Sequence, residues 1–135
     1  AQTRPVNILV MDDEPFIREL ALEMLEFLGN RVTVAEDGTT AINAYTNAME
    51  SADPFDMIIL DVTVPGGLGG PETLAEIRKL DPDVKAVVTS GYSSDPLLAD
   101  FRSHGFVNRL EKPFSIDQVR NVINQVLETI DRRPS

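Results

Sequence analysis

The chain has 135 residues, the length of one domain that can bury about 68–70% of its unfolded surface. It has no cysteine and one histidine, which excludes disulfide scaffolds, thiolate zinc sites and cysteine nucleophiles and gives little support to a Ser–His relay. The formal net charge of −10 argues against direct binding to nucleic acid or anionic membranes and suits a protein that meets proteins or divalent cations.

Five short apolar runs predict five strands in chain order. They cover residues 6–11, 32–34, 57–60, 84–89 and 106–110. The third run, Met57-Ile58-Ile59-Leu60, is continuously apolar, as expected of a central strand covered on both faces.

Segments with apolar residues three and four positions apart predict a helix after each strand. Pro15, Pro71 and Pro96 stand at helix starts, and Ser115 caps the last helix. The fourth helix is short and weakly patterned, ending near Ser103. The residues expected to face the core are Ile17, Leu20, Met24, Phe27 and Leu28 in the first helix, Ala41, Ile42, Tyr45, Ala48 and Met49 in the second, Leu74, Ile77 and Leu80 in the third, and Ile116, Val119, Val122, Ile123, Val126, Leu127 and Ile130 in the last.

The chain offers no candidate for a membrane anchor. No apolar run approaches the roughly 18 residues that a membrane span needs. The stretch 6–11 runs directly into three acidic residues, unlike a signal peptide. We therefore expect a cytoplasmic protein. Because the chain starts at Ala1 without methionine, we expect either a processed start or a module of a longer chain.

The alternation of five strands with five helices predicts an α/β fold with a parallel sheet and helices on both faces. Ligands of such sheets bind outside the carboxyl ends of the strands. Polar residues at those ends therefore form the candidate site. They are Asp12 and Asp13, Asp61, Thr89 and Ser90, and Lys112, with Glu36 and Asp37 farther out.

Each of these residues also has an ordinary structural explanation. Asp12 and Asp13 could cap the first helix, and Asp61 could form a turn. Lys112 could be solvated, and Thr89 could be an ordinary strand residue. Their joint placement favours a site, because carboxylates a few ångströms apart repel by about 3 kcal/mol per pair at an effective dielectric near 20. Such a cluster normally binds a cation, and oxygen ligands suit Mg²⁺.

Four motifs, in order, resemble the receiver domain of bacterial two-component response regulators. They are Ile8-Leu9-Val10-Met11-Asp12-Asp13-Glu14, Ile59-Leu60-Asp61-Val62-Thr63-Val64-Pro65-Gly66, Val88-Thr89-Ser90-Gly91 and Leu110-Glu111-Lys112-Pro113-Phe114. The resemblance implies a doubly wound, five-stranded parallel sheet with the flavodoxin-like order 2-1-3-4-5. It implies one receiver domain over residues 1–135, with a core at about 5–131. Ser90-Gly91-Tyr92 resembles the receivers of hybrid sensor histidine kinases.

The resemblance also implies the chemistry of the site. Asp61 accepts a phosphoryl group from the phosphohistidine of a histidine kinase or a histidine phosphotransfer protein. Asp13, Asp61 and the backbone carbonyl of Thr63 bind Mg²⁺ directly, and Asp12 holds it mostly through water. Mg²⁺ and Lys112 neutralise the charge on the transferring group.

The same resemblance implies how the phosphorylated state is transmitted. The Thr89 hydroxyl hydrogen-bonds the phosphoryl group and pulls the following loop and helix inward. An output partner binds the face formed by the fourth helix, the fifth strand and the fifth helix. The Lys112–Pro113 bond is expected to be cis.

The chain departs from the family pattern at two places. Arg109 stands where an aromatic residue is usual. Because burying an unpaired guanidinium is costly, we expect Arg109 to be at least partly exposed. Its guanidinium would then be available to a carboxylate of a partner protein. The glycine-rich loop 66–70 is not a phosphate-binding P-loop. It is interpreted as a flexible connector or as an adaptable lip beside Asp61.

Three other functions compete with a phosphoacceptor signalling domain that acts only on its own aspartate. An aspartate-nucleophile phosphatase needs a second aspartate two residues after Asp61, where Thr63 stands. A pseudo-receiver used for docking would lack an acidic or lysine site residue, yet all are present. A dinucleotide-binding domain needs Gly-x-Gly-x-x-Gly after the first strand, which is absent.

Overall fold

Five parallel strands form the centre of the structure, a computed structural model that describes residues 4–92 and 94–131. The order across the sheet is β2-β1-β3-β4-β5, which confirms the predicted doubly wound α/β fold. The strands are β1 (Asn7–Met11), β2 (Arg31–Ala35), β3 (Met57–Asp61), β4 (Ala86–Ser90) and β5 (Asn108–Glu111).

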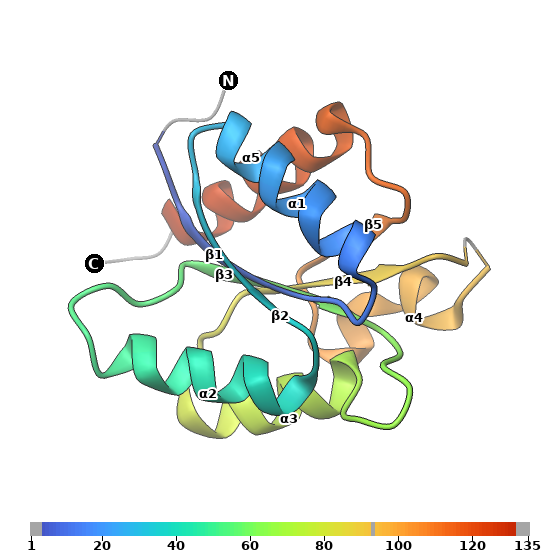
Figure 1. Ribbon diagram of the computed structural model, residues 1–135, viewed down its shortest axis with the longest axis horizontal. Helices are drawn as coiled ribbons and strands as arrows, with labels where there is room; N and C mark the ends of the chain where they lie inside the picture. The colour runs from blue at the N-terminus through green and yellow to red at the C-terminus, as the bar shows by residue number, and fades with distance from the viewer. Residues whose placement is uncertain (1–3, 93, 132–135) are drawn as a thin grey trace.

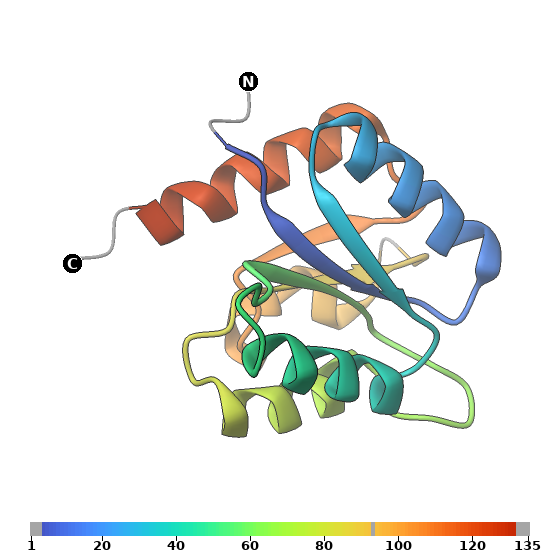
Figure 2. The same cartoon turned by 60° about the vertical axis from the view of Figure 1, so that its left-hand side comes forward.

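Helices cover both faces of this sheet. They are α1 (Pro15–Phe27), α2 (Gly38–Met49), α3 (Gly70–Leu80), α4 (Pro96–Ala99) and α5 (Ile116–Asp131). Figures 1 and 2 show α1 and α5 on one face and α2 and α3 on the other. Within the described part of the chain, no helix has the length and apolarity required to cross a membrane.

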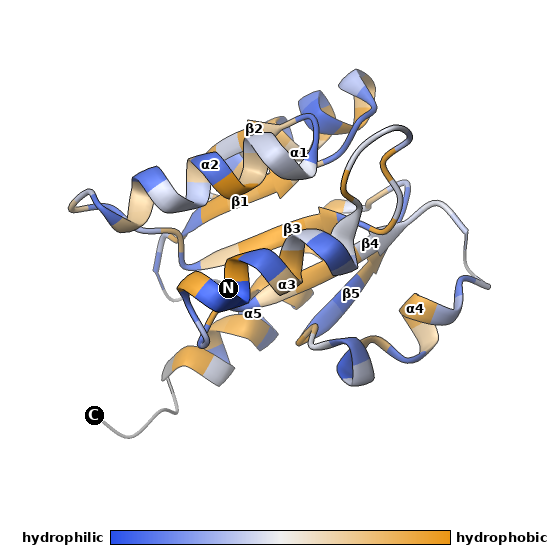
Figure 3. Cartoon of the chain, turned by 90° about the horizontal axis from the view of Figure 1, so that it is seen from below, coloured by the Kyte–Doolittle hydropathy of each residue, from blue (hydrophilic) through white to orange (hydrophobic). Residues whose placement is uncertain are grey.

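Two apolar layers hold the helices to the sheet. Alternate residues of the central strands enter one layer with α1 and α5 and the other with α2, α3 and α4. All residues of β1, β3 and β4 are buried, whereas β5 at the edge is partly exposed. Figure 3 shows the same difference, because β1 and β3 are largely hydrophobic while β5 carries hydrophilic residues.

Three residues predicted to face the core are exposed instead. The buried line of α1 runs through Ile17, Ala21 and Leu25, so Phe27 is turned away from the sheet and is 76% exposed. Met49 and Leu80 are exposed because each is the last residue of its helix. Helical periodicity predicted the inward face correctly in the helix interiors but not at these ends.

The fourth helix is broken into two pieces, unlike the single helix that the sequence predicts. α4 has four residues and is followed by a short 3-10 helix, η1 (Phe101–His104). Asp100 lies between them with φ of −122° and ψ of 43°. These angles are not helical, so the helical hydrogen bonding is interrupted there. In contrast, α5 runs unbroken for 16 residues from a capping box, in which Ser115 Oγ accepts from the N–H of Gln118 and Gln118 Oε1 accepts from that of Ser115.

Candidate functional site

The acidic residues and the lysine predicted for the site meet at the carboxyl edge of the sheet. Asp12 follows β1, Asp61 ends β3 and Lys112 follows β5. The residues two positions earlier in the chain all belong to the apolar layer under α1 and α5. Because strand side chains alternate between faces, the three polar side chains emerge on one face of the sheet and can meet.

Three carboxylates form a cluster that could hold a cation. One oxygen each from Asp12, Asp13 and Asp61 lies within 4.8 Å of the others. Asp12 and Asp61 are buried, at 1% and 6% exposure, whereas Asp13 is half-buried. A set of oxygen donors with one side open to solvent fits Mg²⁺, which keeps several waters and binds through few carboxylates.

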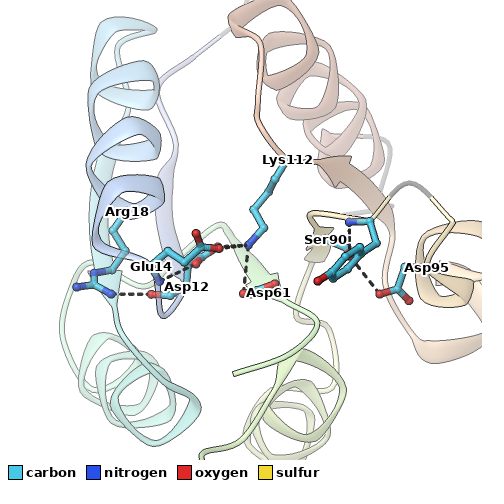
Figure 4. Close-up of polar contacts among 8 residues, drawn as sticks. Asp12, Glu14, Arg18, Asp61, Ser90, Asp95 and Lys112 are labelled. Carbon is cyan, nitrogen blue, oxygen red and sulfur yellow. Dashed lines mark hydrogen bonds and ion pairs between the residues drawn. The ribbon is translucent and has the colours of Figure 1, made fainter. Parts of the chain in front are cut away.

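Lys112 connects the carboxylates, as Figure 4 shows. Its Nζ lies 2.9 Å from Asp12 Oδ2, 3.3 Å from Asp61 Oδ2 and 3.4 Å from Glu14 Oε1. Burial by itself lowers the pKa of the Lys112 ammonium, but the hydrogen bond to Asp12 and the charge of Asp61 outweigh it and raise the pKa. Lys112 therefore stays charged beside the cluster.

The Asp61 carboxyl group resists ionisation. Burial raises the pKa of Asp61 to about 7, with a further contribution from the negative charge of Asp12. Lys112 opposes both effects. A positive charge next to Asp61 stabilises its ionised form, so cation binding and ionisation of Asp61 favour each other.

An open cavity of about 440 Å³ lies over this cluster. Asp13 is among its lining residues, and Figure 4 shows Asp61 and Lys112 on one side and Ser90 and Asp95 on the other. The cavity wall also includes Thr63, whose backbone carbonyl the sequence predicted as a metal ligand. The space is large enough for a phosphoryl group that reaches Asp61 from solvent.

The two hydroxyl residues at the end of β4 differ in position. Thr89 pairs with Asp61 in the sheet register and is 1% exposed, but it is not among the residues that line the cavity. Ser90 does line it. Alternation places Thr89 on the face of Val87, toward α1 and α5, and Ser90 on the face of Val88, toward α4. Thr89 thus shares the sheet face from which Asp61 emerges, and its contact with a phosphoryl group stays a prediction.

Sequence reasoning missed three residues that complete the site. The Arg18 guanidinium donates to the backbone carbonyl of Asp12 at 2.8 Å, and the Glu14 carboxylate contacts Lys112. Asp95 faces the cavity and accepts a hydrogen bond from Ser90. Pro96 indicated a helix start, but no local pattern could indicate that Asp95, the residue before it, also lines the cavity.

The glycine-rich loop is tightly packed at its end, not merely flexible. A Cβ on Gly70 would lie 2.7 Å from the backbone oxygen of Asp61, and one on Gly69 would overlap that of Val62. The N–H of Gly70 donates to the Val62 carbonyl at 3.1 Å. These two glycines bring the start of α3 against the backbone of Asp61, whereas Gly67 makes only ordinary contacts.

Two further expectations concern the fifth strand and its end. The Lys112–Pro113 bond is cis, as predicted. Arg109 is exposed, also as predicted, and its Nη1 donates to the backbone carbonyl of Leu98 in α4 at 3.3 Å. It lines a groove of about 290 Å³ between α4, β5 and α5.

Comparison with known proteins gives a consistent family. The family model described as "Response regulator receiver domain" matches residues 8–124. The chain is 30% identical over 125 residues to the sensor kinase CckA of Brucella abortus, covering 93% of this chain and 13% of that protein. It is 29% identical to the chemotaxis protein CheY of Bacillus subtilis, covering 90% of this chain and 97% of that one.

A solved structure extends the similarity to three dimensions. The response regulator TrrA of Thermotoga maritima, in complex with Mg(2+)-BeF, is 32% identical, with a TM-score of 0.75. The match covers 90% of this chain and 98% of that chain. The chain spans less than half the length of the first curated relatives that it matches, from 13% to 48% of each.

Proposed function

Because the chain belongs to the response regulator receiver domain family, we propose that it is a phosphoacceptor signalling domain whose nucleophile is Asp61. The observation that carries the proposal is the position of Lys112, which bridges buried Asp12 and Asp61 while Asp13 completes the carboxylate cluster. This arrangement lies on the floor of a cavity open to solvent. The donor is a phosphohistidine of a histidine kinase or a histidine phosphotransfer protein.

The chemistry is transfer of a phosphoryl group between two protein side chains. An Asp61 carboxylate oxygen forms the new bond to phosphorus while the bond to the donor imidazole nitrogen breaks, and the imidazole leaves with that electron pair. Lys112 Nζ, 3.3 Å from Asp61, donates to a phosphoryl oxygen as negative charge accumulates there. Asp12, Asp13, Asp61 and the carbonyl of Thr63 would hold Mg²⁺, which supplies further positive charge at this point.

The alternative of an aspartate-nucleophile phosphatase has less support. Thr63 lines the cavity two residues after Asp61 and offers no carboxylic acid for a leaving group. A docking domain that is never phosphorylated would have no reason to keep a buried lysine among buried carboxylates, because desolvating such charges is costly.

One role has two candidates, Thr89 and Ser90. The family resemblance implies that the Thr89 hydroxyl contacts the phosphoryl group, and Ser90 is the neighbouring hydroxyl. Thr89 pairs with Asp61 in the sheet register and lies on the same face, which supports Thr89 for this contact, whereas Ser90 lines the cavity from the face toward α4. Comparing Thr89→Val with Ser90→Ala distinguishes them, because the variant that loses the contact should fail to change conformation when Asp61 is phosphorylated.

The proposed output surface is the groove between α4, β5 and α5. Arg109 lines it with an exposed guanidinium, next to amide side chains of α5 such as Asn121. A planar fork with several donors suits a carboxylate of a protein partner. The partner would belong to the same polypeptide or to another protein, and residues 1–135 would form one domain in either case. A cytoplasmic location remains a prediction of the sequence.

The test is phosphorylation of Asp61 by a small acyl phosphate such as acetyl phosphate. Mass spectrometry of the intact protein should show one added phosphoryl group with Mg²⁺ and none after chelation. Asp61→Asn should abolish it, while Asp100→Asn, a matched change outside the cavity, should not. Equal labelling of Asp61→Asn at another residue would refute the assignment of the nucleophile.

A further inference from the structure

Arg18 holds the peptide group that joins the two acidic residues after β1. Its Nη1 donates at 2.8 Å to the backbone carbonyl of Asp12, which belongs to the peptide bond between Asp12 and Asp13. In the view of Figure 4, the Arg18 guanidinium approaches Asp12 from the side opposite to Lys112. Arg18 is half-buried and is not among the residues that line the cavity. It therefore contacts the site from outside the cavity, through the backbone.

This bond completes the set of contacts that fix Asp12. The N–H of Asp12 donates to the carbonyl of Ala35 at 3.1 Å. Its Oδ1 accepts from the N–H of Glu14 at 2.9 Å, and its Oδ2 accepts from Nζ of Lys112 at 2.9 Å. Arg18 supplies the partner of the remaining polar atom, the carbonyl oxygen. Every polar atom of Asp12 thus has a partner, and the plane of the peptide group that follows is fixed as well.

Asp13 is the carboxylate of the cluster that this peptide group directs. It is half-buried and lines the cavity, and one of its oxygens lies within 4.8 Å of oxygens of Asp12 and Asp61. Among the described residues, 4–92 and 94–131, no hydrogen bond to its carboxylate is found. The backbone therefore sets the direction of this side chain, and a rotation of the peptide plane would carry the carboxylate away from Asp61.

Helix stability does not account for an arginine at this position. Arg18 is the fourth residue of α1, close to the helix N-terminus, where the helix dipole favours negative charge. Its charge also repels any cation bound at the carboxylate cluster. The hydrogen bond to the Asp12 carbonyl offsets these unfavourable interactions.

We propose that Arg18 is a positioning residue for Mg²⁺, which aims the Asp13 carboxylate at the cation by holding the peptide between Asp12 and Asp13. The inference rests on the proposed function, because it requires Mg²⁺ at this cluster. The position of Arg18 and its charge act on the cation with opposite signs. Loss of the positioning bond weakens Mg²⁺ binding, whereas loss of a nearby positive charge strengthens it. The direction of the change therefore identifies the dominant effect.

The experiment is calorimetric titration of the metal-free protein with magnesium chloride. Arg18→Met removes the donor and the charge but keeps an apolar stem, and it should weaken Mg²⁺ binding about tenfold, as loss of an outer-shell partner typically does. Arg120→Met makes the same change of net charge on α5, where Arg120 pairs with Asp117, and should bind Mg²⁺ as the wild type does. Arg18→Lys, which keeps the charge and a donor, should recover part of the loss.

A second measurement separates metal binding from folding and from chemistry. Phosphoryl uptake from acetyl phosphate by Arg18→Met should be slow at low Mg²⁺ concentration and should reach the wild-type rate at saturating Mg²⁺. The metal-free variant should unfold at the same urea concentration as Arg120→Met. If Arg18→Met does not fold, the Mg²⁺ affinity of Arg18→Lys relative to the wild type decides the question.

The possible failures point to different errors. If loss of the Arg18 guanidinium leaves Mg²⁺ affinity unchanged or raises it, or if saturating Mg²⁺ does not restore phosphoryl uptake, the inference is wrong and the proposed function stands. If the wild-type protein binds no Mg²⁺ and takes up no phosphoryl group, the proposed function itself fails, and the inference fails with it.

Discussion

The floor of the site and the β4–α4 segment are held in opposite ways. The floor consists of the ends of β1 and β3 with the start of α3. Both strands are buried along their whole length, and each is paired with a neighbouring strand on both sides. The β4–α4 segment, residues 90–92 and 94–104, contains a four-residue helix in which Leu98 is the buried side chain. Apart from Leu98 and the partly buried Leu97 and Phe101, it is held by the polar contacts of Asp95 and Arg109.

Under the proposed function, this difference separates the residues of the phosphoryl chemistry from the segment that responds to it. Packed strands and glycine contacts cannot yield without loss of the core, so they keep Asp61 and Lys112 in register. A segment held by a few side-chain hydrogen bonds can move when one charge changes. The following predictions would break or sharpen this comparison, from the largest expected effect to the smallest.

Adding a methyl group to the floor should have the largest effect. Gly70→Ala places a Cβ 2.7 Å from the backbone oxygen of Asp61, so either α3 or Asp61 must shift. We expect a loss of about 1–3 kcal/mol in the free energy of unfolding. Phosphoryl uptake should fall about a hundredfold, because displaced reacting groups are costly. Gly67→Ala, which meets only ordinary contacts, is the control, and equal behaviour of the two variants would mean that the floor is not rigid.

Removing the charge of the floor should stabilise the metal-free protein. Burial raises the pKa of Asp61 to about 7, so its protonated form is favoured in the fold and stability is lost as the pH rises from about 4 through 7. At pH 8 the free energy of unfolding of Asp61→Asn should therefore exceed that of the wild type by about 1–2 kcal/mol, after allowance for screening. At pH 4 the two values should be equal. Urea denaturation at both pH values measures this. A variant less stable than the wild type at pH 8 would contradict it.

Loss of a helix cap should have different consequences in the two kinds of helix. Ser115→Ala removes a capping-box residue from α5, which packs along the sheet, and should lower the global free energy of unfolding by about 1 kcal/mol. Asp95→Ala should leave that global value nearly unchanged and increase local exchange in α4. If Asp95→Ala lowers global stability as much as Ser115→Ala does, the β4–α4 segment is not a separate unit.

The smallest effect is expected at Arg109. Its side chain is exposed and makes a hydrogen bond of 3.3 Å to one carbonyl. Arg109→Ala should change the free energy of unfolding by less than about 0.5 kcal/mol. Thermal denaturation tests this, with Arg109→Lys as the variant that keeps the charge. A loss of more than about 2 kcal/mol in the free energy of unfolding would show that the guanidinium packs into the core, as an aromatic residue pointing inward would.

The sequence by itself determined the architecture and the members of the acidic site. Hydrophobic period distinguishes strands from helices locally, and parallel strands bring their carboxyl ends to one edge. Asp12, Asp13, Asp61 and Lys112 follow from those two facts, and the structure brings all four together. The exposure of Arg109 followed from alternation and the cost of burying an unpaired charge.

Only the tertiary structure decided how the site is bounded. Whether Thr89 or Ser90 faces the cavity depends on which face of β4 meets α4, and a shift of one residue exchanges them. The contact of Gly70 with Asp61 and the bond between Ser90 and Asp95 depend on where the segments that follow the strands pack. Composition and periodicity do not predict such distances, because they describe the secondary structure of a segment and not the segments against which it packs.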